Sequence, residues 1–213
     1  MNPTDDTLAA ALLRHGIDLP EPQIVRLEQY CRLLWEWNDK LNLTRHTDYE
    51  KFVGRDLVDS RAFARFLDRG ERILDVGTGG GVPGVLLAIL RADLDVSLCE
   101  SVGKRARVVA DIVERLALGT PVHHARAEDV LAGERYQTLV VRAVARLKKL
   151  LEWLAPHWNA FDRLLVLKGP SWIEERGEAR HFGLMGDLSL RKLTSYPLPG
   201  TQSESVLLQI NRK

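Results

Sequence analysis

Apolar residues recur with two different periods, which divide the chain into a helical start and an alternating remainder. From Ile24 to Leu41 the apolar positions return at helical spacing, and Pro22 can begin the helix that this pattern predicts. A shorter helix is expected before it, from a cap at Thr4 to a stop at Gly16. We therefore expect an N-terminal helical cap over residues 1–50.

Beyond residue 70, short apolar strands alternate with helices. The strands are expected at Arg72–Val76, Asp95–Cys99, Pro121–Ala125, Gln137–Val141 and Arg163–Leu167. The helices are expected from Pro83 to about Arg91, at Val102–Leu118, at Leu147–Trp158 and at Ile173–Phe182. This alternation is typical of βαβ units in a parallel sheet, and the last segment suits an antiparallel pair that includes Ser205–Ile210. The pattern predicts an α/β domain over residues 51–213, with a mostly parallel sheet, joined to the cap in one compact unit.

Composition places the chain among ordinary globular proteins. Of its 213 residues, 45% are apolar and 28% are charged, so a disordered chain, a collagen-like repeat and a disulfide scaffold are excluded. The two cysteines, Cys31 and Cys99, and the six histidines show no metal-ligand spacing, so no metal site is expected. Neither a basic, apolar leader nor an apolar run of about 20 residues occurs, so we expect a cytoplasmic protein that does not enter a membrane.

Positive charge is concentrated in one part of a chain whose net charge is only +1. Residues 104–149 carry 10 basic and 5 acidic side chains, and no acidic residue lies between Arg135 and Leu151. The basic residues that follow the fourth predicted strand are Arg142, Arg146, Lys148 and Lys149. Two interpretations stay open: a solvated start of a helix, or a rim that binds phosphates beside a functional site.

The segment from Asp75 to Gly84, DVGTGGGVPG, is the strongest local signal. It follows the first predicted strand and precedes a helix, where glycines permit a tight turn and a close approach of a nucleotide to the backbone. Gly79, Gly81 and Gly84 also match the G-x-G-x-x-G spacing of dinucleotide-binding loops, so a nicotinamide dinucleotide has to be considered. A phosphate-binding P-loop is excluded because no Gly-Lys-Ser/Thr follows.

Two acidic residues help to choose between the nucleotides. Asp75 ends the first strand, where its carboxylate would repel a pyrophosphate but suits the ammonium and sulfonium of S-adenosylmethionine. The glycine turn also begins at Gly77, two residues before the dinucleotide register. Glu100 ends the second strand and can accept hydrogen bonds from ribose hydroxyls in either cofactor. The sequence therefore favours S-adenosylmethionine.

The segment after the fourth strand bears on the group that receives the methyl group. It reads VVRAVA over residues 140–145 and lacks the Asn/Asp-Pro-Pro-aromatic element of enzymes that methylate exocyclic amines. Neither Cys31 nor Cys99 lies where a nucleophilic cysteine would serve the methylation of pyrimidine carbon five. An acceptor with a free lone pair and no proton to remove, such as guanine N7, needs mainly alignment with the methyl group. We expect no general base, and Arg142 is the candidate for orienting the two ligands.

Seven short elements occur in an order that resembles one bacterial family. They are Trp37-Asn-Asp-Lys-Leu-Asn42-Leu-Thr44, Arg55-Asp-Leu-Val-Asp59-Ser60, the glycine segment Asp75–Gly84, Ser101-Val-Gly-Lys-Arg105, Arg126-Ala-Glu128, Arg142-Ala-Val-Ala145 and Leu167-Lys-Gly169. Together they resemble the GidB-type (RsmG) family, which methylates a guanine at N7 in 16S ribosomal RNA. The glycine segment alone would indicate only a methyltransferase, whereas the Trp-Asn…Asn-Leu-Thr and Ser-x-Gly-Lys-Arg elements make the resemblance specific.

The resemblance implies a class I, Rossmann-like methyltransferase fold with an N-terminal helical cap. It implies that S-adenosylmethionine is bound by Gly77, Val82, Ala127, Glu128 and Arg142. It also implies that Arg126 and Lys168 lie near the RNA. Two positions depart from the family pattern, because Asp56 stands in place of the usual histidine and Val141 in place of the usual serine. This chain therefore has no cation at position 56 and no hydroxyl at position 141.

These observations define the expected function and site. We expect a methyltransferase that acts on guanine N7 in 16S ribosomal RNA of the small ribosomal subunit, as a monomer. Cofactor contacts are expected from Asp75, Gly77, Gly79, Val82, Glu100, Ala127, Glu128 and Arg142. RNA contacts are expected from Arg126, Arg146, Lys148, Lys149 and Lys168. A non-catalytic S-adenosylmethionine- or RNA-binding module and an NAD-dependent oxidoreductase stay as alternatives.

Overall fold

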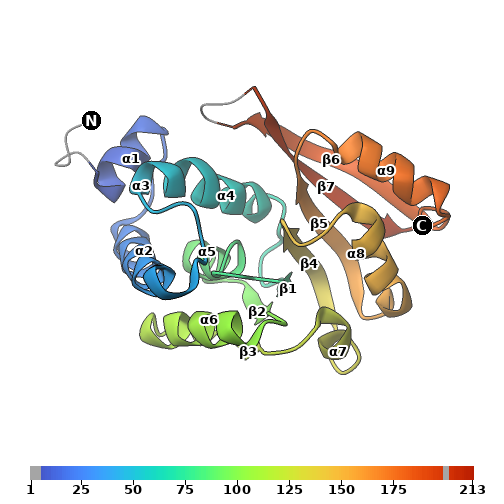
Figure 1. The fold of residues 1–213 in the computed structure, drawn as a ribbon, viewed down its shortest axis with the longest axis horizontal. Helices are drawn as coiled ribbons and strands as arrows, with labels where there is room; N and C mark the ends of the chain where they lie inside the picture. The colour runs from blue at the N-terminus through green and yellow to red at the C-terminus, as the bar shows by residue number, and fades with distance from the viewer. Residues whose placement is uncertain (1–5, 199–201) are drawn as a thin grey trace.

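A seven-stranded sheet forms the centre of the computed structural model, which describes residues 6–198 and 202–213 (Figure 1). The strands are β1 Arg72–Val76, β2 Asp95–Cys99, β3 Val122–His123, β4 Tyr136–Arg142, β5 Phe161–Lys168, β6 Leu188–Pro197 and β7 Glu204–Arg212. Their order across the sheet is β3-β2-β1-β4-β5-β7-β6. Strands β1 to β5 are parallel, and β7 runs antiparallel to both β5 and β6. The predicted parallel sheet with an antiparallel pair near its end is confirmed.

Helices cover both faces of this sheet (Figure 1). They are α1 Leu8–Arg14, α2 Glu21–Leu41, α3 Tyr49–Lys51, α4 Val58–Ala64, α5 Gly84–Leu90, α6 Gly103–Arg115, α7 Ala127–Leu131, α8 Leu147–Leu154 and α9 Trp172–His181. Successive strand residues point to opposite faces, so Ile73 belongs to the core under α1, α2, α5 and α6, and Leu74 to the core under α7, α8 and α9. The alternating pattern of the sequence thus produces a sheet with two buried faces.

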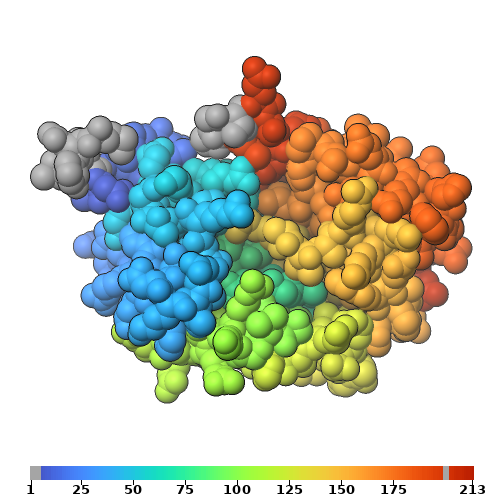
Figure 2. Space-filling model, viewed as in Figure 1, coloured from blue at the N-terminus to red at the C-terminus, as the bar shows by residue number. Residues whose placement is uncertain are grey.

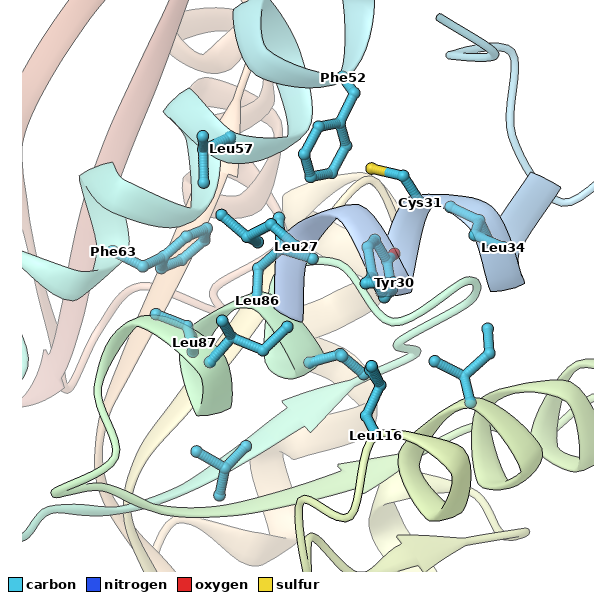
Figure 3. Close-up of a cluster of buried hydrophobic side chains, with 14 of the residues drawn as sticks. Leu27, Tyr30, Cys31, Leu34, Phe52, Leu57, Phe63, Leu86, Leu87 and Leu116 are labelled. Carbon is cyan, nitrogen blue, oxygen red and sulfur yellow. The ribbon is translucent and has the colours of Figure 1, made fainter. Parts of the chain in front are cut away.

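The helical cap shares one hydrophobic core with the sheet. Figure 3 shows Tyr30 of α2 near Phe52 and Leu27 of α2 beside Leu86 of α5, and all four side chains are buried. Burial of such side chains stabilises the fold by roughly 1.5–3 kcal/mol each. The Tyr30 hydroxyl also donates a hydrogen bond to the Gly80 carbonyl at 2.9 Å. The cap therefore packs directly against the glycine segment.

The helical part extends further along the chain than expected. Residues 49–64 form one run, in which α3 leads into a π-helical segment, η2 Phe52–Leu57, and then into α4. The expected boundary at residue 50 falls inside this run. The run buries the carboxylates of Asp56 and Asp59, whose residues are 3% and 1% exposed. Apolar spacing does not reveal this run, because buried charges interrupt the helical period.

Some ends of elements also differ from the sequence pattern. The third strand is confined to Val122–His123, although Pro121–Ala125 was expected, and the short helix α7 that follows was not expected. Thr7 caps the first helix by accepting a hydrogen bond from Ala10 N at 3.2 Å. The expected cap, Thr4, lies outside the described residues.

Within the described ranges, no helix has the length and apolar character needed to cross a membrane.

Candidate functional site

The carboxyl ends of β1 and β4 mark the place where the strand order reverses. From β1 the chain builds the sheet outward through β2 and β3, and then returns to place β4 on the other side of β1. Ligands of open α/β sheets bind in the crevice at such a switch point. The glycine segment Asp75–Gly84 begins here, between β1 and α5, as the sequence predicted.

Backbone conformation explains why this loop is rich in glycine. Gly77, Gly79 and Gly81 have φ angles of 69°, 58° and 105°, a region that other residues rarely adopt. A side chain at Gly77 would also place its Cβ 2.8 Å from Cγ2 of Val144. The turn therefore requires glycine at these positions, and it brings the loop backbone within contact distance of the segment after β4.

Asp75 stabilises the loop from below. Its Oδ2 accepts hydrogen bonds from Thr78 Oγ1 at 2.6 Å and from Gly84 N at 2.8 Å. Burial raises the pKa of this carboxyl to about 6, against the hydrogen bonds from Thr78 and Gly84, which lower it. The other oxygen, Oδ1, is buried without a hydrogen-bond partner in the described part of the chain. A carboxylate buried directly under the loop would favour a positively charged group beside it, such as the ammonium of S-adenosylmethionine.

Glu100 follows β2 and connects the loop to the next strand. Its Oε2 accepts a hydrogen bond from Gly79 N at 3.0 Å, and its Oε1 accepts one from Val102 N at 2.8 Å. The residue is 4% exposed. Each carboxylate oxygen has two lone pairs, so both can still accept a ribose hydroxyl while they hold the backbone.

Two cavities lie on either side of the loop and share Gly77. The first, which we call the α8-side cavity, has a volume of about 220 Å³ and is lined by the expected residues Ala127 and Glu128, together with Trp153. The second, the cap-side cavity, has a volume of about 330 Å³ and is lined by residues that include Val82 and Arg142. Figure 2 shows the molecule hollowed between the blue and cyan helical cap and the yellow-to-orange part of the chain, with teal and green residues at the floor.

The structure thus brings most of the expected cofactor residues together. Gly77, Gly79, Val82, Ala127, Glu128 and Arg142 all line one or both cavities. Asp75 and Glu100 line neither cavity, but both are hydrogen-bonded to the glycine loop. This arrangement therefore fits a nucleoside that carries an amino acid group. Apolar walls suit its base, the carboxylates suit its hydroxyls and its ammonium, and the glycine backbone lies between them.

Arg142 ends β4 in a buried network of ion pairs. Its Nη2 lies 2.7 Å from Asp56 Oδ1, and its Nε lies 2.8 Å from Asp59 Oδ2. Burial alone would lower the pKa of this guanidinium, but the two carboxylates raise it above its ordinary value. Tyr196 of β6 donates a hydrogen bond to Asp59 at 2.7 Å, and His46 contacts Asp56 at 2.9 Å. Arg142 is therefore held in a fixed place beside the loop.

Four of the five basic residues expected to bind RNA lie at the surface beside the candidate site, and the fifth, Lys168, does not. Arg126 is exposed at the α8-side cavity, and Arg146, Lys148 and Lys149 line a further hollow at the start of α8. There Lys148 Nζ lies 3.4 Å from the ring centre of Phe182, and Arg146 pairs with Glu178 at 2.9 Å. The hollow shares Val144 and Trp153 with the α8-side cavity, so these basic residues lie along the edge of the candidate site.

Lys168 has a different environment. Its ammonium donates hydrogen bonds to the Ala145 carbonyl at 2.6 Å and to Glu175 Oε2 at 2.7 Å. Its side chain is 9% exposed, and the same Glu175 oxygen accepts a hydrogen bond from Leu147 N at the start of α8. These contacts give Lys168 a structural role, so we do not include it in the proposed RNA surface.

Some residues at the site were missed by the sequence reasoning. Arg45, His46 and Asp56 line the cap-side cavity, and Arg105 of α6 joins them there. The motif Ser101–Arg105 already pointed to Arg105, but the other three come from a cap that the strand–helix alternation does not place. The signal that could have found them is the density of polar residues between Asn38 and Asp59 in an otherwise helical cap.

Comparison with known proteins identifies the family. Residues 23–191 match the family GidB, described as rRNA small subunit methyltransferase G. The chain is 49% identical over 200 residues to ribosomal RNA small subunit methyltransferase G of Rhodopirellula baltica. This alignment covers 94% of this chain and 87% of that protein. The protein of the same name from Clostridium perfringens is 32% identical over 92% of this chain and 85% of its own length.

The chain belongs to the GidB family. The expected family, enzyme class and cofactor are thereby confirmed: it is an S-adenosylmethionine-dependent methyltransferase.

Solved structures support the fold. TrmK of M. capricolum, solved with S-adenosylhomocysteine, superposes with a TM-score of 0.58 at 12% identity, over 72% of this chain and 67% of that chain. A putative methyltransferase from Streptococcus mutans, SMU.1697c, superposes with a TM-score of 0.52 over 75% of this chain and 98% of that chain. The class I methyltransferase fold of the sequence analysis is confirmed.

Proposed function

We propose that the protein transfers a methyl group from S-adenosylmethionine to N7 of a guanine in 16S ribosomal RNA of the small ribosomal subunit. The observation that carries this proposal is a complete methyltransferase loop, with a cavity on each side, in a chain of the GidB family. The segment after β4 supports N7 as the acceptor, because it offers neither a Pro-Pro-aromatic element nor a cysteine.

The two cavities divide the ligands between them. The α8-side cavity, with Leu150 and Trp153 among its walls, would take the adenosine end of the cofactor, next to Ala127 and Glu128. Asp75 and Glu100 would receive its ammonium and ribose hydroxyls. Gly77, which lines both cavities, would lie between the methionine end of the cofactor and the cap-side cavity.

The RNA would approach along the basic edge beside these cavities. Arg126, Arg146, Lys148 and Lys149 are charged groups of this edge, and each is suited to contact phosphates rather than bases. Lys168 is left out, because its ammonium is already bound by Ala145 and Glu175.

Alignment supplies most of the catalysis in this proposal. Bound S-adenosylmethionine supplies an electrophilic methyl group on a sulfonium. Guanine N7 has a free lone pair and no proton, so the protein has to exclude water and hold the base in line with that group. Arg142 can orient both ligands, since two buried carboxylates fix its guanidinium beside Gly77. No side chain has to remove a proton from the acceptor.

The remaining expectations concern the setting of the reaction. We propose that the protein works in the cytoplasm, as a monomer, without binding a membrane. The two alternatives, an NAD-dependent oxidoreductase and a non-catalytic binding module, are not favoured, because the chain belongs to a methyltransferase family.

Two measurements test the proposal. Calorimetry should detect binding of S-adenosylhomocysteine and none of NAD. Methyl-labelled S-adenosylmethionine, incubated with unmethylated small ribosomal subunits, should then label the 16S RNA. Binding of the cofactor without any transfer to naked 16S RNA or to small subunits would favour the non-catalytic module, and binding of NAD would favour the oxidoreductase.

A further inference from the structure

Three basic side chains of the cap-side cavity are not among the residues expected to hold the cofactor. They are Arg45 and His46, from the segment after α2, and Arg105, from α6. Arg45 and Arg105 are exposed, and within residues 6–198 and 202–213 neither has an acidic side chain at ion-pair distance. An exposed arginine without a partner in its own chain is well suited to a phosphate.

His46 is held in place from several directions. Its backbone N donates a hydrogen bond to Thr44 Oγ1 at 3.0 Å, and its carbonyl accepts one from Trp35 Nε1 at 2.8 Å. Thr44 N in turn donates to Asn38 Oδ1 at 2.8 Å. Asn38 and Thr44 belong to the Trp-Asn…Asn-Leu-Thr element, so this motif serves to fix the segment that carries His46.

Asp56 determines which nitrogen of the His46 ring carries the proton. His46 Nδ1 lies 2.9 Å from Asp56 Oδ2, while the other oxygen of this buried carboxylate is paired with Arg142. A carboxylate accepts, so Nδ1 is the donor, and in the neutral ring Nε2 keeps a free lone pair. Within the described part of the chain, Nε2 has no hydrogen-bond partner. In its neutral form, His46 therefore offers this cavity a positioned acceptor.

We propose that the cap-side cavity receives the acceptor nucleotide beside the expected cofactor residues Gly79, Val82 and Arg142, which share its lining. His46 Nε2 would accept a hydrogen bond from the Watson–Crick edge of the guanine, and Arg45 and Arg105 would bind the flanking phosphates. This inference rests on the proposed function and adds to it the residues that recognise the base. The cavity volume of about 330 Å³ is in the range of small-ligand sites.

The edges of guanine explain this division of roles. The N1–H and the N2 amino group are donors on the Watson–Crick edge, which suit an acceptor such as Nε2. N7 and O6 are acceptors on the opposite edge, where an arginine would normally bind both. An arginine there would cover the atom that has to be methylated. The two arginines therefore contact phosphates, and the base is recognised from its other edge.

The position of Gly77 connects the two ligands. Gly77 lines both cavities, so a base in the cap-side cavity meets the methyl donor across this glycine. A cavity of about 330 Å³ is too small for a duplex, so the acceptor would have to come from a loop or flip out of its stack. The hydrogen bond to His46 would then help to hold the extruded base in the cavity.

The first test separates RNA binding from cofactor binding. His46→Ala and the double variant Arg45→Ala, Arg105→Ala are compared with Arg107→Ala, which removes an exposed arginine of α6 that does not line the cavity. We expect the first two to raise the KM for small subunits about ten-fold and to leave the rate at saturating substrate within about three-fold. S-adenosylhomocysteine affinity should stay within about two-fold of the original, and Arg107→Ala should behave like the unchanged protein.

The second test asks whether His46 touches the base. Small subunits are reconstituted with 16S RNA that carries inosine or 1-methylguanosine at the acceptor position. The unchanged protein should lose about ten-fold in kcat/KM with at least one of them, and His46→Ala should lose less than about three-fold with that one. Equal losses in both proteins would overturn the contact, as would a KM unchanged by His46→Ala. If the unchanged protein methylates no guanine N7, the proposed function fails; if it does and the variants match it, this inference alone fails.

Discussion

Glu100 holds the glycine loop through its carboxylate, and we propose that the same carboxylate binds the ribose hydroxyls of the cofactor. Glu100→Ala removes the acceptor of Gly79 N and the expected acceptor of the ribose hydroxyls together. A charge-assisted hydrogen bond contributes about 1.5–3 kcal/mol, so affinity for S-adenosylhomocysteine should fall about ten- to a hundred-fold. Isothermal calorimetry measures this change. Unchanged affinity would remove Glu100 from the site.

Asp75 should make folding stability depend on pH. Its pKa in the folded chain is about 6, above the ordinary 3.8, so the folded chain binds this proton more tightly than the unfolded chain. The contribution of this group is therefore fully present below about pH 4 and is lost as the pH rises to about 6.

Asp75→Asn keeps an acceptor for Thr78 and Gly84 but removes the buried charge. Its free energy of unfolding at pH 7.5 should exceed that of the unchanged protein by up to roughly 3 kcal/mol, with no difference near pH 4. Its affinity for S-adenosylhomocysteine should fall, because the ammonium loses its counter-charge. Urea unfolding at the two pH values checks the first part; an Asn variant that is less stable at pH 7.5 would contradict it.

The glycines and carboxylates of the candidate site could be predicted from the sequence. Glycines with positive φ, a carboxylate after β1 and another after β2 follow from what a nucleotide loop requires, and the structure places them together. The partners of Arg142 could not be predicted in this way. Asp56, Asp59 and Tyr196 come from η2, α4 and β6, and their contacts depend on how the cap packs against the sheet.

At the level of elements, the ion pairs of Arg142 connect the cap to the end of β4. Arg142→Ala would leave Asp56 and Asp59 buried without their cation, which costs about 3–5 kcal/mol for a broken buried pair. Thermal unfolding should show a large drop in Tm. The matched control, Arg146→Ala, breaks an exposed pair with Glu178 that contributes about 0–1 kcal/mol. Equal effects of the two variants would show that the Arg142 network does not hold the cap.

The basic edge at the start of α8 can be tested by charge reversal. Lys148→Glu with Lys149→Glu should weaken RNA binding and reduce its dependence on salt. The reason is that fewer phosphate contacts release fewer counterions from the RNA on binding. Affinity for S-adenosylhomocysteine should not change. Arg191→Glu with Lys192→Glu, on β6, is the control with the same change of charge. If both double variants bind RNA equally well at low salt, the edge of α8 is a solvated helix face.

Periodicity located β1, β2, β4 and β5 together with α5, α6 and α8, because apolar runs and regular spacing survive in a sheet that is buried on both faces. It failed where tertiary contacts determine the structure. The π-helical segment η2 buries Asp56, and the five-residue helix α7 is too short to show a period. Both lie next to the site, so the elements that sequence patterns miss are here among those that shape the cavities.

For the whole molecule, the account predicts a reaction without an essential base. Guanine N7 carries no proton, so the single-turnover rate with saturating RNA should be nearly flat from about pH 6 to 8.5. His46→Ala should change the KM for RNA without creating or removing a limb of this profile. Rate measurements across this range provide the check. A steep acid limb that vanishes in the His46 variant would mean that the acceptor has to lose a proton.

The identity of the methylated atom shows whether guanine N7 is the acceptor. Unmethylated small subunits are incubated with the protein and S-adenosylmethionine, and the nucleosides of the 16S RNA are separated and analysed by mass spectrometry against standards. The account predicts one new modified nucleoside, 7-methylguanosine, which is absent when S-adenosylmethionine is omitted. A new N2-methylguanosine, 5-methylcytidine or methylated adenosine in its place would contradict the account.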